Sequence, residues 1–147
     1  MAKKRKSQKE LNETLISVLK KWQKIEEKSI ASITESKKKI ANPLIKQIFS
    51  IIANDSKMHR KVQQFIIDSL EKKAITLTPE ELGDISTIID NHITMERETV
   101  SLGNQAKEAS NNFVHKYLIN YLLIDERKHD DLLDELANIK NHIYPYA

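Results

Sequence analysis

The chain repeats one pattern of polar and apolar side chains at an offset of 70 residues. Three polar positions recur with identical gaps: Glu26, Asp55 and His59 in the first copy, and Glu96, Asp125 and His129 in the second. Apolar positions follow the same offset: Leu15 and Ile85, Ile48 and Leu118, and Val62 and Leu132. Acids and imidazoles in register with core residues predict a duplicated helical hairpin with a polar centre. Burying such groups is costly unless a cation compensates them.

A chain of 147 residues, 39% of them apolar, suits one domain with a core of ordinary size. With only two glycines and three prolines, long helices are expected. The sequence lacks an apolar run of about 18 residues and a signal peptide, so we expect a cytoplasmic protein without a membrane partner. The absence of cysteine excludes disulfides, iron–sulfur clusters and a cysteine-based electron-transfer module. The remaining oxygen and imidazole ligands favour iron or manganese.

Five positive charges lie within the first nine residues, and without them the formal net charge of +3 becomes −2. We therefore interpret residues 1–7 as a basic, flexible tail. Residues 8–142 are predicted to form the helical bundle, and residues 143–147 a C-terminal tail. One tryptophan and few other aromatic residues offer no platform for stacked bases, so we expect no specific nucleic-acid partner.

Apolar residues recur at helical spacing in four segments of similar length, and no segment shows the alternation of a strand. The first segment covers about residues 8–40, and Pro43 marks the start of the second. The pair Asn111-Asn112 suits a turn before the fourth segment. The sequence therefore predicts an all-α fold, a four-helix bundle built from two helical hairpins.

A rotation of about 100° per residue places most polar candidates on the inner side of their helices. The candidates nearest the centre of an apolar stripe are Glu26, Asp55, His59, His92, Glu96 and His129, with Asp125 and Glu126 beside His129. Removing one partner of a buried ion pair costs about 3–5 kcal/mol, so several buried carboxylates in one slice of a core need cations. The basic residues of that slice mostly point outward: Lys57, Arg60, Arg127 and Lys128. The pattern therefore predicts a metal centre with two ions.

These residues resemble the ligand pattern of the ferritin-like, rubrerythrin-related family of di-iron carboxylate proteins, over about residues 8–140. In that family the first and third helices each give a glutamate, and the second and fourth each give Glu-x-x-His. By resemblance, Glu26 and Glu96 match the lone glutamates, and Glu126 with His129 matches the fourth-helix motif. The resemblance implies two iron or manganese ions and an oxidoreductase acting on dioxygen, peroxide or ferrous iron. It also implies paired bundles, as in a homodimer.

The second helix departs from the family pattern, because Ser56 stands where a bridging glutamate belongs and serine is a poor iron ligand. Asp55 and His59 can replace that ligand by chelating one turn apart, with His92 as an additional donor. Alternatively, the site holds one ion or none. We expect His92 and Asp125 to lie behind the ligands, where Asp125 orients a ligating histidine. The alternative function is a metal-free helical scaffold or dimerisation protein.

The connection between the second and third helices has two interpretations. Thr78-Pro79 has the cap and the proline of a helix start. If the third helix begins there, the connection is too short to run the length of the bundle, and an up-down-up-down bundle results. If the helix begins near Asp84 instead, with Thr78 to Glu81 as a separate turn, a ferritin-like lengthwise crossover is feasible. The family resemblance favours the crossover.

Overall fold

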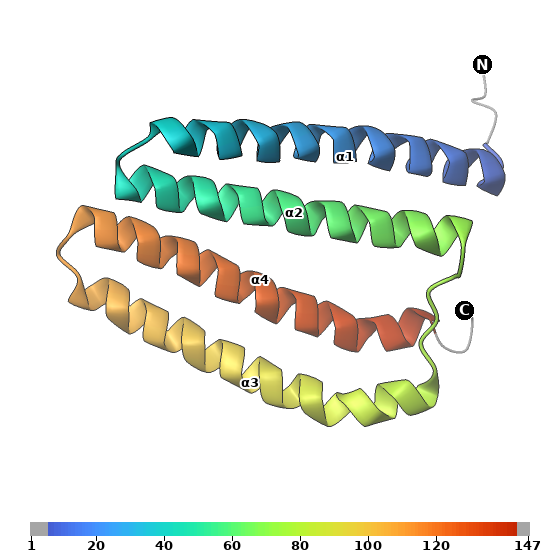
Figure 1. The fold of residues 1–147 in the computed structure, drawn as a ribbon. Helices are drawn as coiled ribbons and strands as arrows, with labels where there is room; N and C mark the ends of the chain where they lie inside the picture. Colours follow the sequence, from blue (N-terminus) through green and yellow to red (C-terminus); the bar gives the residue numbers. More distant parts are fainter. Residues whose placement is uncertain (1–5, 144–147) are drawn as a thin grey trace, which may run out of the picture. The chain divides into compact units, whose positions relative to one another are not determined.

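Four helices make up the part of the chain that the computed structural model describes, residues 6–143 apart from the side chains of residues 82 and 140–143. They are α1 (Gln8–Lys39), α2 (Pro43–Glu71), α3 (Pro79–Ala109) and α4 (Phe113–Ile143) (Figure 1). No strand occurs within the described residues. The predicted all-α class and the four helices of a four-helix bundle are therefore confirmed. The predicted C-terminal tail lies almost entirely outside the described residues.

The helices form two compact units, each of them a helical hairpin. Helix α1 packs against α2 in the first unit, which we call hairpin 1, and α3 packs against α4 in the second, hairpin 2. The two turns are built alike. The Asn42 side chain accepts hydrogen bonds from the backbone N–H groups of residues 44 and 45, and the Asn112 side chain accepts from residues 114 and 115. The offset of 70 residues therefore relates the turns as well as the polar positions.

Each hairpin also begins with the same start signal, a capping box. The Ser7 hydroxyl accepts from the backbone N–H of Glu10, whose carboxylate accepts from the Ser7 N–H. Thr78 and Glu81 make the same reciprocal pair at the start of α3. Two backbone N–H groups that lack helical partners are satisfied in this way at each helix start.

The capping box corrects the predicted start of the third helix. Helix α3 begins at Pro79, and Thr78 with Glu81 forms its cap instead of a separate turn, so the start near Asp84 is wrong. Helix α2 ends at Glu71. The connecting residues 72–78 can span at most about 25 Å, whereas a lengthwise crossover needs about 45 Å. The connection is therefore too short for the lengthwise crossover. Its length agrees with the alternative of a short turn, as in an up-down-up-down bundle.

The core of each hairpin is a seam of residues spaced three and four apart, the spacing that keeps one side of a helix against its neighbour. In hairpin 1 the buried apolar residues of the seam are Leu19, Ala53 and Ile67, and in hairpin 2 they are Ile89 and Leu123. The buried residues of hairpin 1 also include three polar ones, Glu26, Ser56 and Gln63. Polar groups thus sit within the seam and not only at its edge.

One contact shows how the seams differ in packing. A Cβ atom at Gly103 would lie 2.6 Å from Cδ2 of Leu123, so only glycine leaves room for that leucine, which is 2% exposed. The equivalent positions in hairpin 1, at the offset of 70, are Ile33 and Ala53. The large and the small residue have therefore exchanged helices between the two hairpins, which keeps the combined volume similar.

Candidate metal centre

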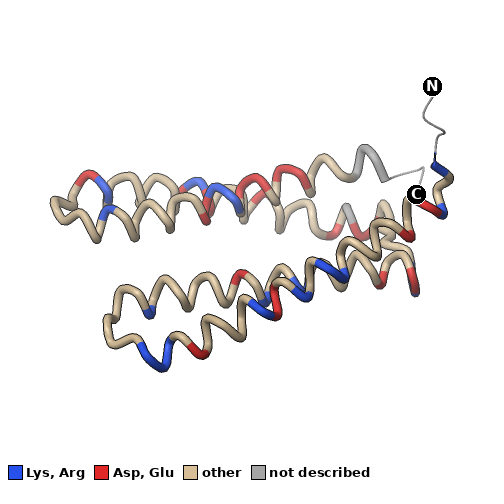
Figure 2. Tube along the Cα trace, turned by 90° about the horizontal axis from the view of Figure 1, so that it is seen from above, with Lys and Arg blue, Asp and Glu red and all other residues tan. Residues whose placement is uncertain are grey.

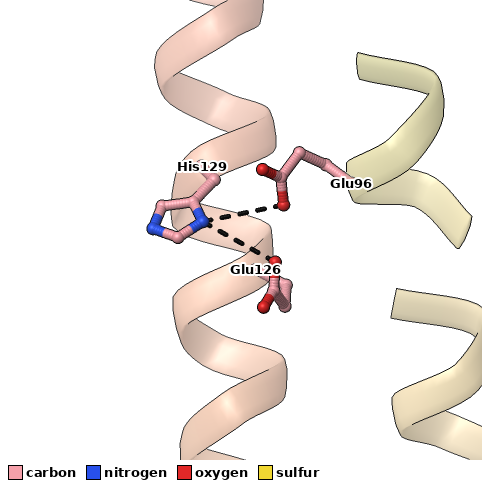
Figure 3. Close-up of side chains that lie close together, drawn as sticks. All are labelled: Glu96, Glu126 and His129. Atoms are coloured by element: carbon pink, nitrogen blue, oxygen red, sulfur yellow. Dashed lines mark ion pairs between the residues drawn. The ribbon is translucent and has the colours of Figure 1, made fainter. Parts of the chain in front are cut away.

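Three potential ligands meet in the seam of hairpin 2. Glu96 comes from α3, and Glu126 and His129 come from adjacent turns of α4 (Figure 3). The His129 Nδ1 atom lies 3.6 Å from Oε2 of Glu96 and 3.6 Å from Oε2 of Glu126. One ligand atom of each residue lies within 4.8 Å of the other two, and all three residues are half-buried. The structure thus brings together three of the predicted ligands.

Helix geometry explains why these residues converge. Glu96 follows the buried Ile89 by seven residues and precedes Gly103 by seven, which places all three on the seam side of α3. Glu126 follows the buried Leu123 by three residues and lies on the seam side of α4. The 3.6-residue period then places His129, three residues further, one turn along on nearly the same side.

The two carboxylates of this cluster disfavour each other's charge. The pKa of Glu96 is raised above its ordinary value of 4.5, first because Glu126 shares a hydrogen bond with the protonated form. Burial of Glu96 and Coulomb repulsion from Glu126 act in the same direction, whereas His129 opposes them. The Oε2 atom of Glu96 is also buried and has no hydrogen-bond partner. The cluster therefore holds two carboxylates whose repulsion His129 compensates only in part.

The donor set suits a divalent cation. Carboxylate oxygen and imidazole nitrogen bind such ions at about 2.0–2.2 Å, which places the ligand atoms of one ion roughly 3.0–3.5 Å apart. The 3.6 Å separations are a few tenths of an ångström wider, within the reach of a small side-chain rotation. An ion would also provide a partner for the buried Oε2 atom of Glu96. On this test the residues fit a metal.

Thr99 is a further residue of the centre that the sequence pattern did not reveal. Its Oγ1 atom lies 2.7 Å from the backbone carbonyl oxygen of Glu96 and 3.3 Å from Oε2 of Glu126. The shared hydroxyl proton steers the Glu126 carboxylate toward α3. A hydroxyl three residues after a candidate ligand is the signal that would have found it, because such residues are neighbours on a helix.

Hairpin 1 holds the counterpart of this cluster, with Ser56 in the place of Glu126. Glu26 is 7% exposed and Ser56 is 5% exposed. The Nδ1 atom of His59 lies 3.2 Å from Oε1 of Glu26. The pKa of Glu26 is lowered, chiefly because the Ser56 hydroxyl donates to it and outweighs the effect of burial, with His59 and Trp22 adding to the same shift. The charged form of this carboxylate is thus stabilised by its neighbours.

Three predicted residues make no described contact with the candidate ligands of their hairpin. Asp55 and His92 are exposed, and Asp125 makes an ion pair with Lys128 instead of supporting His129 in any described contact. The seam of α2 passes through Ala53 and Ser56, so Asp55 falls beside the seam and not on it. Asp55 therefore does not replace the missing glutamate near Glu26, and neither Asp55 nor His92 is among the buried residues of its own hairpin.

His59 also lies at the edge of the seam, and its side chain is 55% exposed. It belongs to a second apolar stripe of α2, which also includes Ile45, Ile52 and Val62, all of them exposed in hairpin 1. A helix with two neighbours in a bundle carries two such stripes. A rotation that averages over both stripes places Asp55 and His59 at their common centre, and so does not show that Asp55 lies beside the seam.

An ion pair lies beside each cluster. In hairpin 1 the acid is on the first helix and the base on the second, and in hairpin 2 this order is reversed. In hairpin 1, Nη2 of Arg60 lies 2.7 Å from Oε1 of Glu27. At the equivalent positions of hairpin 2, Arg97 lies on the first helix and Asp130 on the second, with Nε and Oδ1 3.7 Å apart. Arg60 is half-buried and bridges α2 to α1, unlike Lys57, Arg127 and Lys128, which are exposed as expected.

No protein-family model, no curated protein and no solved structure matches this chain. Among the described residues, no helix combines the length and the apolar character that crossing a membrane requires. The function proposed below therefore rests on the chemistry of the two clusters.

Proposed function

We propose that this protein binds one divalent metal ion, iron or manganese, through Glu96, Glu126 and His129 of hairpin 2. The observation that carries the proposal is the buried Oε2 atom of Glu96, which has no hydrogen-bond partner and lies in a cluster with a second carboxylate. A bound cation removes the repulsion between the two carboxylates and satisfies that atom. Each of these effects makes metal binding stabilise the folded protein.

The counterpart in hairpin 1 supports one ion per chain, not two. The charged form of Glu26 is already stabilised, chiefly by Ser56 and also by His59 at 3.2 Å, so an ion would have to compete with these neighbours. The site of hairpin 1 also has one carboxylate where hairpin 2 has two. Since ion affinity rises with the number of charged ligands, the metal should select hairpin 2.

Three protein ligands would leave open coordination positions on the ion. When bound, a redox-active metal would supply the chemistry toward dioxygen, peroxide or ferrous iron that the resemblance to ferritin-like proteins implies. The residues of this chain hold the ion, and Thr99 orients one of its ligands. Because the chain has no cysteine, electrons for any turnover would come from an external reductant.

Metal titration tests the proposal. Protein reconstituted with manganese, or with ferrous iron without oxygen, should retain about one ion per chain, and a hundredfold excess over the dissociation constant should raise Tm by roughly 5–10 °C. The Glu126→Ser variant, which copies the arrangement of hairpin 1, should lose both effects. Glu98→Ser is the matched control, because Glu98 is an exposed carboxylate of the same hairpin that lies outside the cluster.

A metal-free helical scaffold is the second candidate, and the satisfied Glu26 carboxylate favours it, because that centre is stable without an ion. The two functions give different results in the same titration. A scaffold would retain no metal after reconstitution, and its Tm would not respond to manganese or ferrous iron. That outcome would reject the metal-binding function.

A further inference from the structure

Each helix of this chain has two candidate partners, because the offset of 70 residues makes α3 the counterpart of α1, and α4 the counterpart of α2. In the structure α1 packs against α2, and α3 packs against α4. An exchanged pairing, α1 with α4 and α3 with α2, would join helices whose apolar spacing also matches. The connection of residues 72–78 permits an antiparallel pair of α2 and α3, just as the turns permit the other pairs. Residues at the seams must therefore select the observed pairing.

The net charges of the hairpins do not provide this selection. Residues 1–75 contain 18 Lys and Arg against 8 Asp and Glu, and residues 76–147 contain 6 against 13. The formal charges are therefore +10 for the first unit and −7 for the second. Figure 2 marks the charged residues along the two hairpins. Opposite net charges attract, so on their own they would favour the exchanged pairing.

The ion pairs beside the two clusters do distinguish the partners. Nη2 of Arg60 lies 2.7 Å from Oε1 of Glu27, and Nε of Arg97 lies 3.7 Å from Oδ1 of Asp130. Within a hairpin both orders place an acid beside a base, so both are favourable there. In the exchanged pairing, Glu27 would face Asp130, and Arg60 would face Arg97. Both contacts would then join like charges, which repel each other.

The sizes of the seam residues distinguish the partners as well. A Cβ atom at Gly103 would lie 2.6 Å from Cδ2 of Leu123. Helix α1 carries Ile33 at the position equivalent to Gly103, so in the exchanged pairing its side chain would overlap Leu123. Helix α3 would in turn set Gly103 against Ala53, and two small residues leave a void. Each observed pairing combines one large and one small residue at these positions.

We propose that these differences in charge and size form a pairing code, by which the seam side of α1 accepts α2 and rejects α4. By the same code α3 accepts α4 and rejects α2. Helix α1 fits a partner that offers a small residue and a base, and α3 fits one that offers a leucine and an acid. Reversing the code in both helices of one hairpin leaves the contacts of that hairpin satisfied, so the code acts on the choice of partner. This inference does not depend on the metal centre.

Crosslinking of the full chain tests the pairing code, because the chain has no cysteine of its own. Gln23 and Gln64 meet across α1 and α2, with Nε2 and Oε1 3.0 Å apart, and Asp134 of α4 is the residue equivalent to Gln64. The substitutions Gln23→Cys, Gln64→Cys and Asp134→Cys let a short thiol crosslinker join position 23 to position 64 in the observed pairing, or to position 134 in the exchanged one. Mass spectrometry of peptides after refolding measures the ratio of the two products. Without further substitutions the 23–64 product should dominate by about tenfold or more.

Recoding the first helix of each hairpin should reverse this ratio. The recoded chain carries Glu27→Arg and Ile33→Gly in α1, with Arg97→Glu and Gly103→Ile in α3. Its α1 then matches α4 and its α3 matches α2, so the 23–134 product should exceed the 23–64 product. A chain with only the two charge substitutions should show a smaller shift toward the 23–134 product, roughly fivefold at low salt and lost at about 1 M salt.

The matched control keeps the four substitutions of the recoded chain and adds the complementary ones in the second helices. These are Ala53→Leu and Arg60→Asp in α2, with Leu123→Ala and Asp130→Arg in α4. Every helix is then altered, yet each hairpin again has matching partners, so the 23–64 product should dominate as it does without recoding. The control therefore separates a change of pairing from any other cause of proximity between positions 23 and 134.

Four results would overturn the proposal. One is a recoded chain that keeps the original product ratio while it shows native helical circular dichroism and cooperative melting. Another is a recoded chain that does not fold although the control does, because helices with matching residues would then have failed to accept each other. The third is a control that does not fold, or that gives the 23–134 product as often as the recoded chain. The last is a charge-only chain whose ratio at low salt does not shift.

Discussion

The two polar centres of this protein share their geometry and differ in how the central charge is satisfied. Glu26 and Glu96 occupy equivalent positions, each close to a histidine from the partner helix. In hairpin 1 the third residue is Ser56, a donor that stabilises the charged carboxylate. In hairpin 2 the third residue is Glu126, a second acid that destabilises it. One side chain thus decides whether the centre is complete without an ion or requires a proton or a cation.

Placing a glutamate in hairpin 1 should give the largest effect, because it would abolish the difference between the centres. Ser56 is almost completely buried beside Glu26, so Ser56→Glu adds a second buried charge. Without metal the variant should lose about 3–5 kcal/mol of unfolding free energy. Added manganese should restore part of this loss and raise the stoichiometry to about two ions per chain. Urea unfolding with and without manganese measures both, and a loss that metal does not reduce would contradict the equivalence of the centres.

The exchange of large and small residues between the seams should give the next largest effect. Gly103→Ile should cost about 1–3 kcal/mol, because the new side chain overlaps Leu123. Leu123→Ala alone should cost about 2–5 kcal/mol through the cavity it leaves. The double variant reproduces the Ile33 and Ala53 arrangement of hairpin 1, so it should be more stable than the sum of the single effects predicts. A double-mutant cycle from chemical denaturation measures the coupling.

The pH dependence of stability should have opposite signs in the two metal-free centres. The lowered pKa of Glu26 contributes stability that is present above 4.5 and is lost as the pH falls through the folded-state pKa. The raised pKa of Glu96 means that stability falls as the pH rises from 4.5 through the folded-state pKa. At neutral pH, Glu26→Gln should therefore lower Tm by a few degrees, whereas Glu96→Gln should raise it. Melting curves from acid to neutral pH test this, and equal shifts for both variants would contradict it.

Exchanging the acid and the base of the Glu27–Arg60 ion pair should give the smallest effect. Glu27→Arg or Arg60→Asp alone should cost up to about 1 kcal/mol, because the pair is partly exposed and each change leaves two like charges together. The double variant carries the polarity found at Arg97 and Asp130, so it should return close to native stability. Thermal melting at low salt measures the difference. A double variant as unstable as the worse single one would show that the pair is not equivalent in the two hairpins.

Helix positions were accessible from the sequence because their determinants are local. Proline at the first turn, asparagine at the hairpin turns and the spacing of apolar residues each act within a few positions of the chain. The start of α3 was placed too late, near Asp84, because the expected lengthwise crossover was given more weight than the capping box at Thr78. The convergence of Glu96, Glu126 and His129 was also predictable, since helical spacing and a hairpin fold determine it.

The remaining errors have a physical origin in averaging. Helix α2 carries a seam stripe and a neighbouring apolar stripe, and one rotation angle cannot separate them. Asp55 was therefore placed at the centre of the apolar stripe of α2, although it lies beside the seam. The opposite charges of the hairpins were overlooked for a similar reason, because the composition of the whole chain combines them. Counting charges in each half of the repeat is the signal that would have found them.

The short connection between α2 and α3 has a further consequence for how the protein can change. Hairpin 1 has a capping box at the start of α1, and hairpin 2 has one at the start of α3. Each hairpin also has its own asparagine turn. Neither hairpin therefore depends on the other for these helix boundaries. Reordering or repeating the hairpins in a sequence would therefore leave these local helix signals intact. A tandem of two second hairpins would carry two clusters of two carboxylates and a histidine, and a tandem of two first hairpins would carry none.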